Sequence, residues 1–237
     1  MTRFVTKEEP TAADATFLNG FDLVIIGRSV PSGNYQSTTE RAFWNSAITK
    51  PVINMGGYTL RASRLGFTTG ETIPDTTSDI SLQALAPSHP IFSGVALDAG
   101  NIMVNSFAGI TTFNAVAQRG ISVNSSPLAG GGTIIATIGT GTIDNAANLG
   151  TGMIIAQWAP GSTTQTGNVL AGHRLVFFSG SREMGITSEG AGIFDLAPAG
   201  QAMFLNAVAY MSAIPEPSTY VLLGIGALAL IWRWKRS

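Results

Sequence analysis

Continuous apolar runs alternate with segments of helical spacing along the first 55 residues. Residues 21–27 and 51–55 are apolar without a polar alternation, which is typical of parallel strands covered on both faces. Residues 38–48 lie between them and space Ala42, Phe43 and other apolar positions as a helix does. A strand, a helix and a strand joined by short loops predict a βαβ unit, and therefore a parallel sheet.

Start signals support the helices of this region. Thr11 is placed to cap a helix that continues to residue 18, and Ser37 or Thr38 is placed to cap the helix of the βαβ unit. Residues 2–7 form a further short strand candidate. The N-terminal region is therefore predicted to be α/β.

The remainder of the chain predicts more strands and one long helix. Residues 65–87 show a looser pattern, and residues 88–95 resemble an ordered loop. A helix is expected at residues 198–211. Strands are expected at residues 101–107, 115–118, 133–138, 153–158 and 174–179. We expect one domain over residues 1–212.

Four segments carry a resemblance to a known fold group. Residues 22–29, 51–64, 89–95, and 172–180 with the helix that follows resemble the class I glutamine-amidotransferase-like and ThuA-like group. The resemblance implies an α/β, flavodoxin-like three-layer sandwich with a mainly parallel sheet. Amidotransferases of this group use a catalytic cysteine on a nucleophile elbow. The chain has no cysteine, so the resemblance excludes that activity here.

The C-terminal tail combines a rigid motif, an apolar run and a basic end. Pro215, Glu216 and Pro217 fall in a linker at residues 213–219, and residues 220–237 hold an apolar run followed by three basic residues. The apolar part is shorter than the roughly 20 residues that span a relaxed bilayer. We expect a short single transmembrane helix with its basic end in the cytoplasm, which places the domain outside.

The tail resembles the PEP-CTERM sorting signal. The resemblance rests on the order of Pro215, Glu216, Pro217, the apolar run and the basic end. It implies an exosortase-type processing enzyme and the membrane as partners. It also implies a membrane-anchored precursor whose domain is exported to the periplasm and then to the cell surface or beyond, with a link to exopolysaccharide.

The first ten residues lack a basic region followed by an apolar region, which an exported protein would show. We therefore expect the chain to be truncated at its N-terminus, with a signal peptide and a first strand encoded upstream.

Composition narrows the chemistry. Charged residues make up 11% of the chain, against about 25% in typical soluble domains. Ten basic and thirteen acidic residues precede Pro215, which gives no general affinity for nucleic acid. With two histidines, His89 and His173, and scattered carboxylates, the sequence predicts no metal site and no cofactor.

Residues that follow the predicted parallel strands form the candidate binding site, because ligands of open α/β sheets bind beyond the carboxyl ends of the strands. Arginine side chains there suit carboxylate, phosphate or sulfate, and tyrosine rings suit a sugar. In the alternative interpretation the arginines pair with Glu40, Glu183 or backbone carbonyls and hold the loops. The candidates are Arg28, Ser29, Tyr35, Tyr58, Arg61, Arg64 and Arg182.

No catalytic residue is predicted. Ser29 and Ser181 lie at strand ends but outside a Gly-x-Ser-x-Gly elbow. His89 and His173 are expected to have structural roles. The sequence favours an exported surface protein with a non-catalytic structural or ligand-binding role, the ligand being an acidic polysaccharide. The alternative is a periplasmic carbohydrate-active enzyme that uses the arginine-rich edge.

Overall fold

The computed structural model describes residues 9–74, 76, 79–109, 112–113, 116–117, 121–139, 152–179 and 194–214. The helices are α1 (Ala12–Leu18), α2 (Thr38–Ala42) and α3 (Pro198–Ser212), with the π-helical η2 (Phe43–Ala47) and the 3-10 turns η1 (Ser32–Tyr35), η3 (Gly57–Leu60) and η4 (Pro90–Phe92). The strands are β1 (Val24–Ile26), β2 (Val52–Asn54), β3 (Leu82–Ala84), β4 (Thr112–Phe113), β5 (Val116–Ala117), β6 (Thr133–Ile138), β7 (Met153–Trp158) and β8 (Arg174–Phe177).

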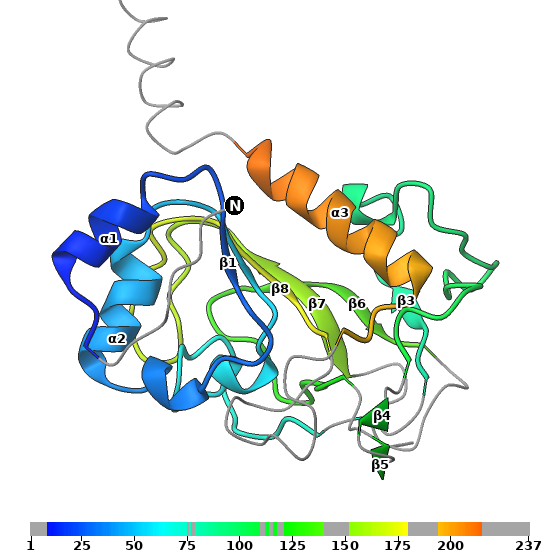
Figure 1. Cartoon of the computed structure of the whole chain (residues 1–237), viewed down its shortest axis with the longest axis horizontal. Coiled ribbons are helices and arrows are strands. Elements are labelled where there is room, and N and C mark those ends of the chain that lie inside the picture. Colours follow the sequence, from blue (N-terminus) through cyan, green and yellow to red (C-terminus); the bar gives the residue numbers. More distant parts are fainter. Residues whose placement is uncertain are drawn as a thin grey trace, which may run out of the picture.

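A six-stranded mixed sheet forms the centre of the domain, in the order β1-β2-β8-β7-β6-β3 (Figure 1). β1, β2 and β8 are parallel, whereas the pairs β8–β7, β7–β6 and β6–β3 are antiparallel. The prediction of a mainly parallel sheet is therefore wrong for the β7–β6–β3 half. The connection between β7 and β8 contains no helix, and antiparallel neighbours need no helical crossover.

The predicted βαβ unit is confirmed, because β1 and β2 are parallel neighbours with α2 and η2 between them in the sequence. Both predicted helix starts are also correct. The hydroxyls of Thr11 and Ser37 accept hydrogen bonds from the N–H groups of Asp14 and Glu40, whose carboxylates accept the N–H of the capping residue in return. Such capping boxes are local interactions, which is why the sequence reveals them.

One predicted strand is wrong, and two strands, β3 and β4, were missed. Residues 101–107 make only isolated bridges, such as Gln83 with Ile102, because the exposed residues 104–106 interrupt the extended chain. The sheet edge is instead β3, within the loosely patterned region. The signal of β3 is weak because the polar Ser81 lies between the apolar Ile80 and Leu82 in this buried run.

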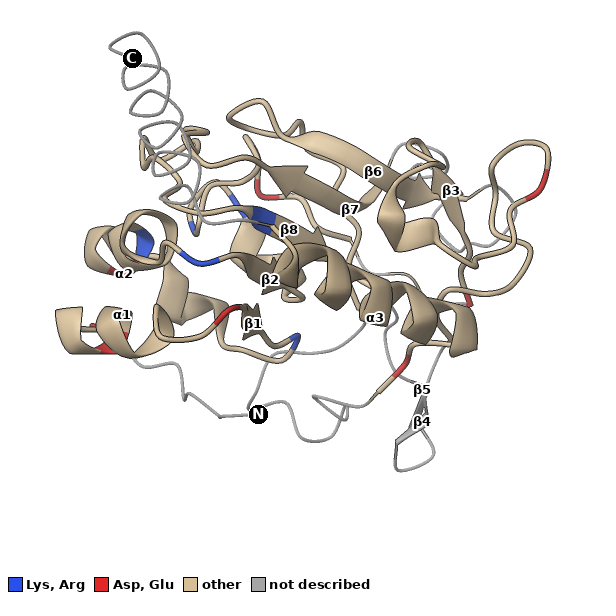
Figure 2. Cartoon of the chain, turned by 90° about the horizontal axis from the view of Figure 1, so that it is seen from above, with Lys and Arg blue, Asp and Glu red and all other residues tan. Residues whose placement is uncertain are grey.

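Helices cover both faces of the sheet. On one face Arg174 contacts the backbone of Trp44 in η2, and on the other the ring of Phe177 lies 5.6 Å from the ring of Phe204 in α3. Successive residues of a strand point to opposite faces, and Arg174 and Phe177 are three positions apart. α2 and η2 therefore lie on one side of the sheet, and α3 lies on the other (Figure 1). α3 has no charged residue and is therefore drawn in tan in Figure 2. Among the described residues, no helix is long and apolar enough to cross a bilayer.

Arg174 joins the sheet to the end of the helix that precedes β2. Its side chain is 3% exposed, and its two terminal nitrogens donate to five backbone carbonyls. These carbonyls include the end of η2, where the helix leaves oxygens without internal donors. Burial lowers the pKa of Arg174 to about 9, which leaves the guanidinium charged at neutral pH and suited to a helix C-terminus. The acceptors are Trp44, Asn45, Ile48, Lys50 and His173.

We expect Arg174→Met to lower the free energy of unfolding by at least about 3 kcal/mol, because each buried acceptor left without a donor costs about 1–3 kcal/mol. Urea unfolding measures the change. Arg41→Met is the control, since Arg41 is only half-buried and donates to a single carbonyl, that of Gln36. Equal losses in the two variants would show that the carbonyl network around Arg174 contributes little.

Candidate functional site

The parallel strands β1, β2 and β8 end at the same edge of the sheet. The loops after β1 and β2 lie against each other there: η1 contacts η3, and a side chain on Gly56 would approach the carbonyl oxygen of Gly27 to 3.5 Å. The loop after β2 is held by Asn54, whose amide donates to Thr59 and accepts from the N–H of Gly56. The loops after β1 and β2 therefore lie side by side at this edge.

Arg28 follows β1 and forms a buried ion pair with Asp195. Its Nη1 lies 2.5 Å from Oδ1 of Asp195, and the two side chains are 10% and 5% exposed. Burial lowers the pKa of Arg28, and the charge of Asp195 opposes that shift. The guanidinium also lies over the ring of Phe194, 5.9 Å from its centroid. Arg28 thus joins the end of β1 to the chain just before α3, as the alternative interpretation of the arginines expects, but with Asp195 as its partner.

Tyr35 lies in the core. Its side chain is 0% exposed, and its ring centroid is 5.3 Å from that of Trp44. A ring that is packed in this way has no face for a sugar. Glu40, considered above as an arginine partner, accepts the N–H groups of Gln36 and Ser37 instead.

Tyr58 and Arg61 form a stacked pair at the same edge. The guanidinium carbon of Arg61 lies 4.6 Å from the centroid of the Tyr58 ring, and both side chains are half-buried. The Nε of Arg61 is buried and has no hydrogen-bond partner. A cation over an aromatic face is held in place with its remaining donors free to meet an anion. We call Tyr58 and Arg61 the tyrosine–arginine pair.

Arg64 lies three positions after Arg61 and is linked to the acidic residue Glu71 through Ser63. Its Nη1 donates to the hydroxyl of Ser63 at 3.1 Å, and that hydroxyl donates to Glu71 at 2.8 Å. Glu71 also accepts the N–H of Ser63. Arg64 is therefore placed next to a local carboxylate, which lowers the positive potential that it adds to the edge.

Three sets of predicted residues fall outside the described residues. They are the short strand at residues 2–7, Arg182 of the binding site, and Pro215, Glu216 and Pro217 of the sorting motif with the apolar run of the tail. Ser29 follows Arg28 in the sequence, and its side chain is half-buried.

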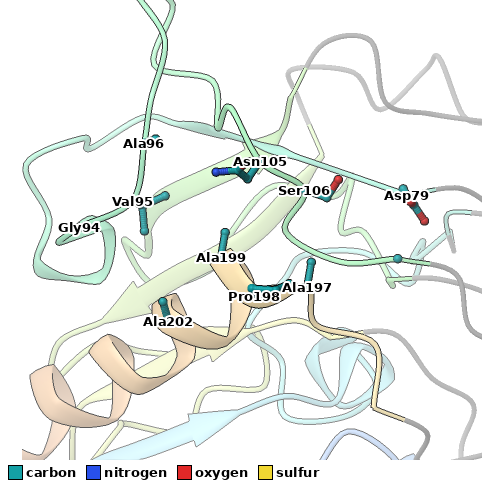
Figure 3. A pocket seen from close by; sticks show the side chains of 11 residues that line it. Asp79, Gly94, Val95, Ala96, Asn105, Ser106, Ala197, Pro198, Ala199 and Ala202 are labelled. Atoms are coloured by element: carbon teal, nitrogen blue, oxygen red, sulfur yellow. The ribbon is translucent and has the colours of Figure 1, made fainter.

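A cavity of about 650 Å³ opens beside the start of α3, and no pattern in the sequence predicts it (Figure 3). The small side chains of Ala199 and Ala202 line it, and Asp79, Asn105 and Ser106 supply polar groups. Next to the cavity, α3 approaches the chain at Phe107 closely. A side chain on Gly200 would lie 2.1 Å from the carbonyl oxygen of Phe107. None of the predicted binding residues that the structure describes lines this cavity.

Sequence reasoning also missed Asp195, which lies 167 positions from its partner Arg28. Asp195 precedes the helix start in a segment without a motif, so no local signal reveals it.

Comparison with known proteins identifies the tail. Residues 213–236 match the family model of the PEP-CTERM protein-sorting motif. The chain carries a PEP-CTERM sorting signal. Such a signal indicates an exported, membrane-anchored precursor that an exosortase-type enzyme processes and that is sorted outside the cytoplasm.

The domain itself is less well matched. No curated protein matches the chain. Among solved structures, the "Cytoplasmic Protein STM3548 from Salmonella typhimurium" is similar at 11% sequence identity and a TM-score of 0.45, over 88% of this chain and 76% of that one. The described fold is a mixed α/β domain.

We expect Arg28→Met to lower the free energy of unfolding by about 3 kcal/mol, because it leaves the buried carboxylate of Asp195 without its cation. The double variant Arg28→Met/Asp195→Leu should regain more than about 1 kcal/mol of that loss, since it removes both charges. Urea unfolding of the single and double variants tests this. Additive losses would show that the two side chains do not depend on each other.

Proposed function

We propose that this protein is an exported, non-catalytic cell-surface protein that is associated with exopolysaccharide. The observation that carries the proposal is the junction between domain and tail: α3 ends at Ser212, and the sorting motif begins at residue 213. In this proposal a domain over residues 1–212 is followed at once by a linker at residues 213–219 and a membrane segment at residues 220–237. This order suits a cargo domain that a processing enzyme separates from its anchor.

A role without catalysis fits the residues at the carboxyl edge of the sheet. Arg28 and Asp195 neutralise each other in a buried pair, and Asn54 and Thr59 bond to each other and to the backbone of their own loop. Groups that are engaged in this way hold the loops rather than react. The chain has no cysteine, which is the nucleophile that class I glutamine amidotransferases use.

The tyrosine–arginine pair is the part of this edge that suits a ligand, and we propose that it binds an acidic polysaccharide. The Tyr58 ring offers a surface for a sugar, and the Arg61 guanidinium offers forked donors for a carboxylate or sulfate. Arg64 follows in the same loop and adds charge. Arg28 is paired with Asp195 inside the domain and holds the end of β1 there. Arg182 is an additional candidate donor.

The sorting part of the proposal predicts a processed product. In cells that contain an exosortase, the mature protein should lack the residues after the Pro-Glu-Pro motif. Replacing Pro215, Glu216 and Pro217 by alanine should leave the whole tail attached and the protein in the membrane fraction. Intact-mass measurement of the mature protein decides the matter, and retention of residues 232–237 in the wild type would contradict it.

The binding part predicts a loss of affinity at Arg61. A hydrogen bond to a charged group contributes about 1.5–3 kcal/mol, so Arg61→Ala should weaken the binding of oligogalacturonate by roughly ten- to a hundredfold. Arg61→Lys should also weaken it, because lysine keeps the charge and loses the fork. Titration calorimetry of the full chain in detergent micelles at low salt measures both.

Two controls separate binding from folding. Arg41→Ala removes a half-buried arginine on α2, away from the tyrosine–arginine pair, and should leave the affinity unchanged. A neutral oligosaccharide of the same length should bind more weakly than oligogalacturonate. If Arg61→Ala lowers the melting temperature and leaves the affinity intact, the arginine is structural and the binding proposal is wrong.

A further inference from the structure

Two histidines meet at the opposite edge of the sheet from the tyrosine–arginine pair. His173 precedes β8, and His89 precedes η4, more than 80 positions away. Both rings pack on Tyr210 of α3, with centroids 4.6 Å from it for His89 and 6.3 Å for His173. Gln157 of β7 completes the group. We call these four residues the histidine cluster.

The amide oxygen of Gln157 is the common acceptor of the histidine cluster. The hydroxyl of Tyr210 donates to it at 2.9 Å, and Nε2 of His173 lies 3.3 Å from it. Nδ1 of His89 accepts the N–H of Ile91 at 3.3 Å and so caps η4. That bond requires His89 to be neutral, because a protonated imidazole has no acceptor.

Positive charge is unfavourable at both imidazoles. Burial lowers the pKa of His89 and of His173, and Arg174 and His89 lower that of His173 further by charge repulsion. Gln157 lies close enough to His89 to oppose that shift in its pKa, although Nε2 of His89 makes no hydrogen bond within the described residues. The groups that act on the two rings from β7, β8 and α3 are thus Gln157, Arg174 and Tyr210, and none of them is a carboxylate that would favour the protonated form.

The histidine cluster holds the second half of α3. Tyr210 lies one turn after Asn206, whose amide donates to the carbonyls of Ile91 and Ser93 at 3.0 and 2.8 Å. η4 is therefore attached to α3 by the Asn206 amide, which does not titrate, and by the contact between His89 and Tyr210, which does. The sorting motif begins three residues after Tyr210.

We propose that the histidine cluster is a pH-dependent attachment of the last turns of α3, which fixes the base of the sorting tail at neutral pH and releases it in acid. Protonation removes the acceptor that caps η4 and places a positive charge on His173 beside the charges of Arg174 and His89. The last turns of α3 then separate from η4 and β7 while Arg174 continues to hold the other face of the sheet. The attachment does not depend on the polysaccharide site.

The direction of the pH dependence follows from the lowered pKa values of His89 and His173. The unfolded or detached chain binds protons more readily than the attached one, so attachment is fully stable above the ordinary histidine pKa of about 6.5. It is lost progressively as the pH falls from there through the lowered pKa values of the attached state.

Cysteine labelling tests the proposal, because the chain has no cysteine of its own. Met211 is fully buried in the last turn of α3, so Met211→Cys reports its detachment. The labelling rate with 4,4′-dithiodipyridine, for the full chain in detergent micelles, is divided by that of a short reference peptide at each pH. The ratio should rise roughly tenfold from pH 7.5 to pH 5.

Matched variants identify the cause. In a His89→Gln/His173→Gln background the ratio should be the same at both pH values, whereas Asn206→Ala should raise it at both and keep the pH dependence. The melting temperature of chains without the added cysteine should show the same pattern. An unchanged ratio in the wild-type background, or an equal rise in the double histidine variant, would overturn the proposal, whatever the outcome of the sorting and binding experiments.

Discussion

The guanidinium of Arg174 is the interaction on which the architecture depends. It is buried between β8 and the end of η2, and its five bonds to carbonyls satisfy oxygens from the helix end, from the chain before β2 and from its own strand. One side chain thereby fixes the position of the βαβ unit against the third parallel strand. Because only 11% of the residues are charged, few other charged side chains are available to satisfy buried carbonyls.

The two edges of the sheet differ in what holds them. At the carboxyl edge the Arg28–Asp195 pair and the Asn54 network fix the loops, which leaves the tyrosine–arginine pair half-buried on top of them. At the amino edge the histidine cluster attaches α3 through neutral hydrogen bonds and ring contacts. A charged pair tolerates acid until its carboxylate titrates, whereas a neutral imidazole responds at a milder pH. The edge nearest the sorting tail is thus the more pH-sensitive one.

The sequence by itself determined the features that rest on neighbouring residues. The capping boxes at Thr11 and Ser37, the parallel pair β1–β2, the strands β6 and β7 and the helix α3 follow from local spacing and were predicted within a few residues. The sorting signal was predicted too, because its three parts are consecutive in the chain. Tyr58 and Arg61 lie three positions apart, so their stacking is also a local matter.

Only the tertiary structure decided how distant segments meet. β7 is buried on both faces, so its sequence has no alternation from which its direction could be predicted, and it runs antiparallel to β8. Tyr35 was expected at the site and lies in the core, since burial depends on Trp44 and its surroundings. Asp195 and the histidine cluster bring together residues far apart in the sequence. Such contacts depend on how the layers pack, and no periodicity along the chain encodes them.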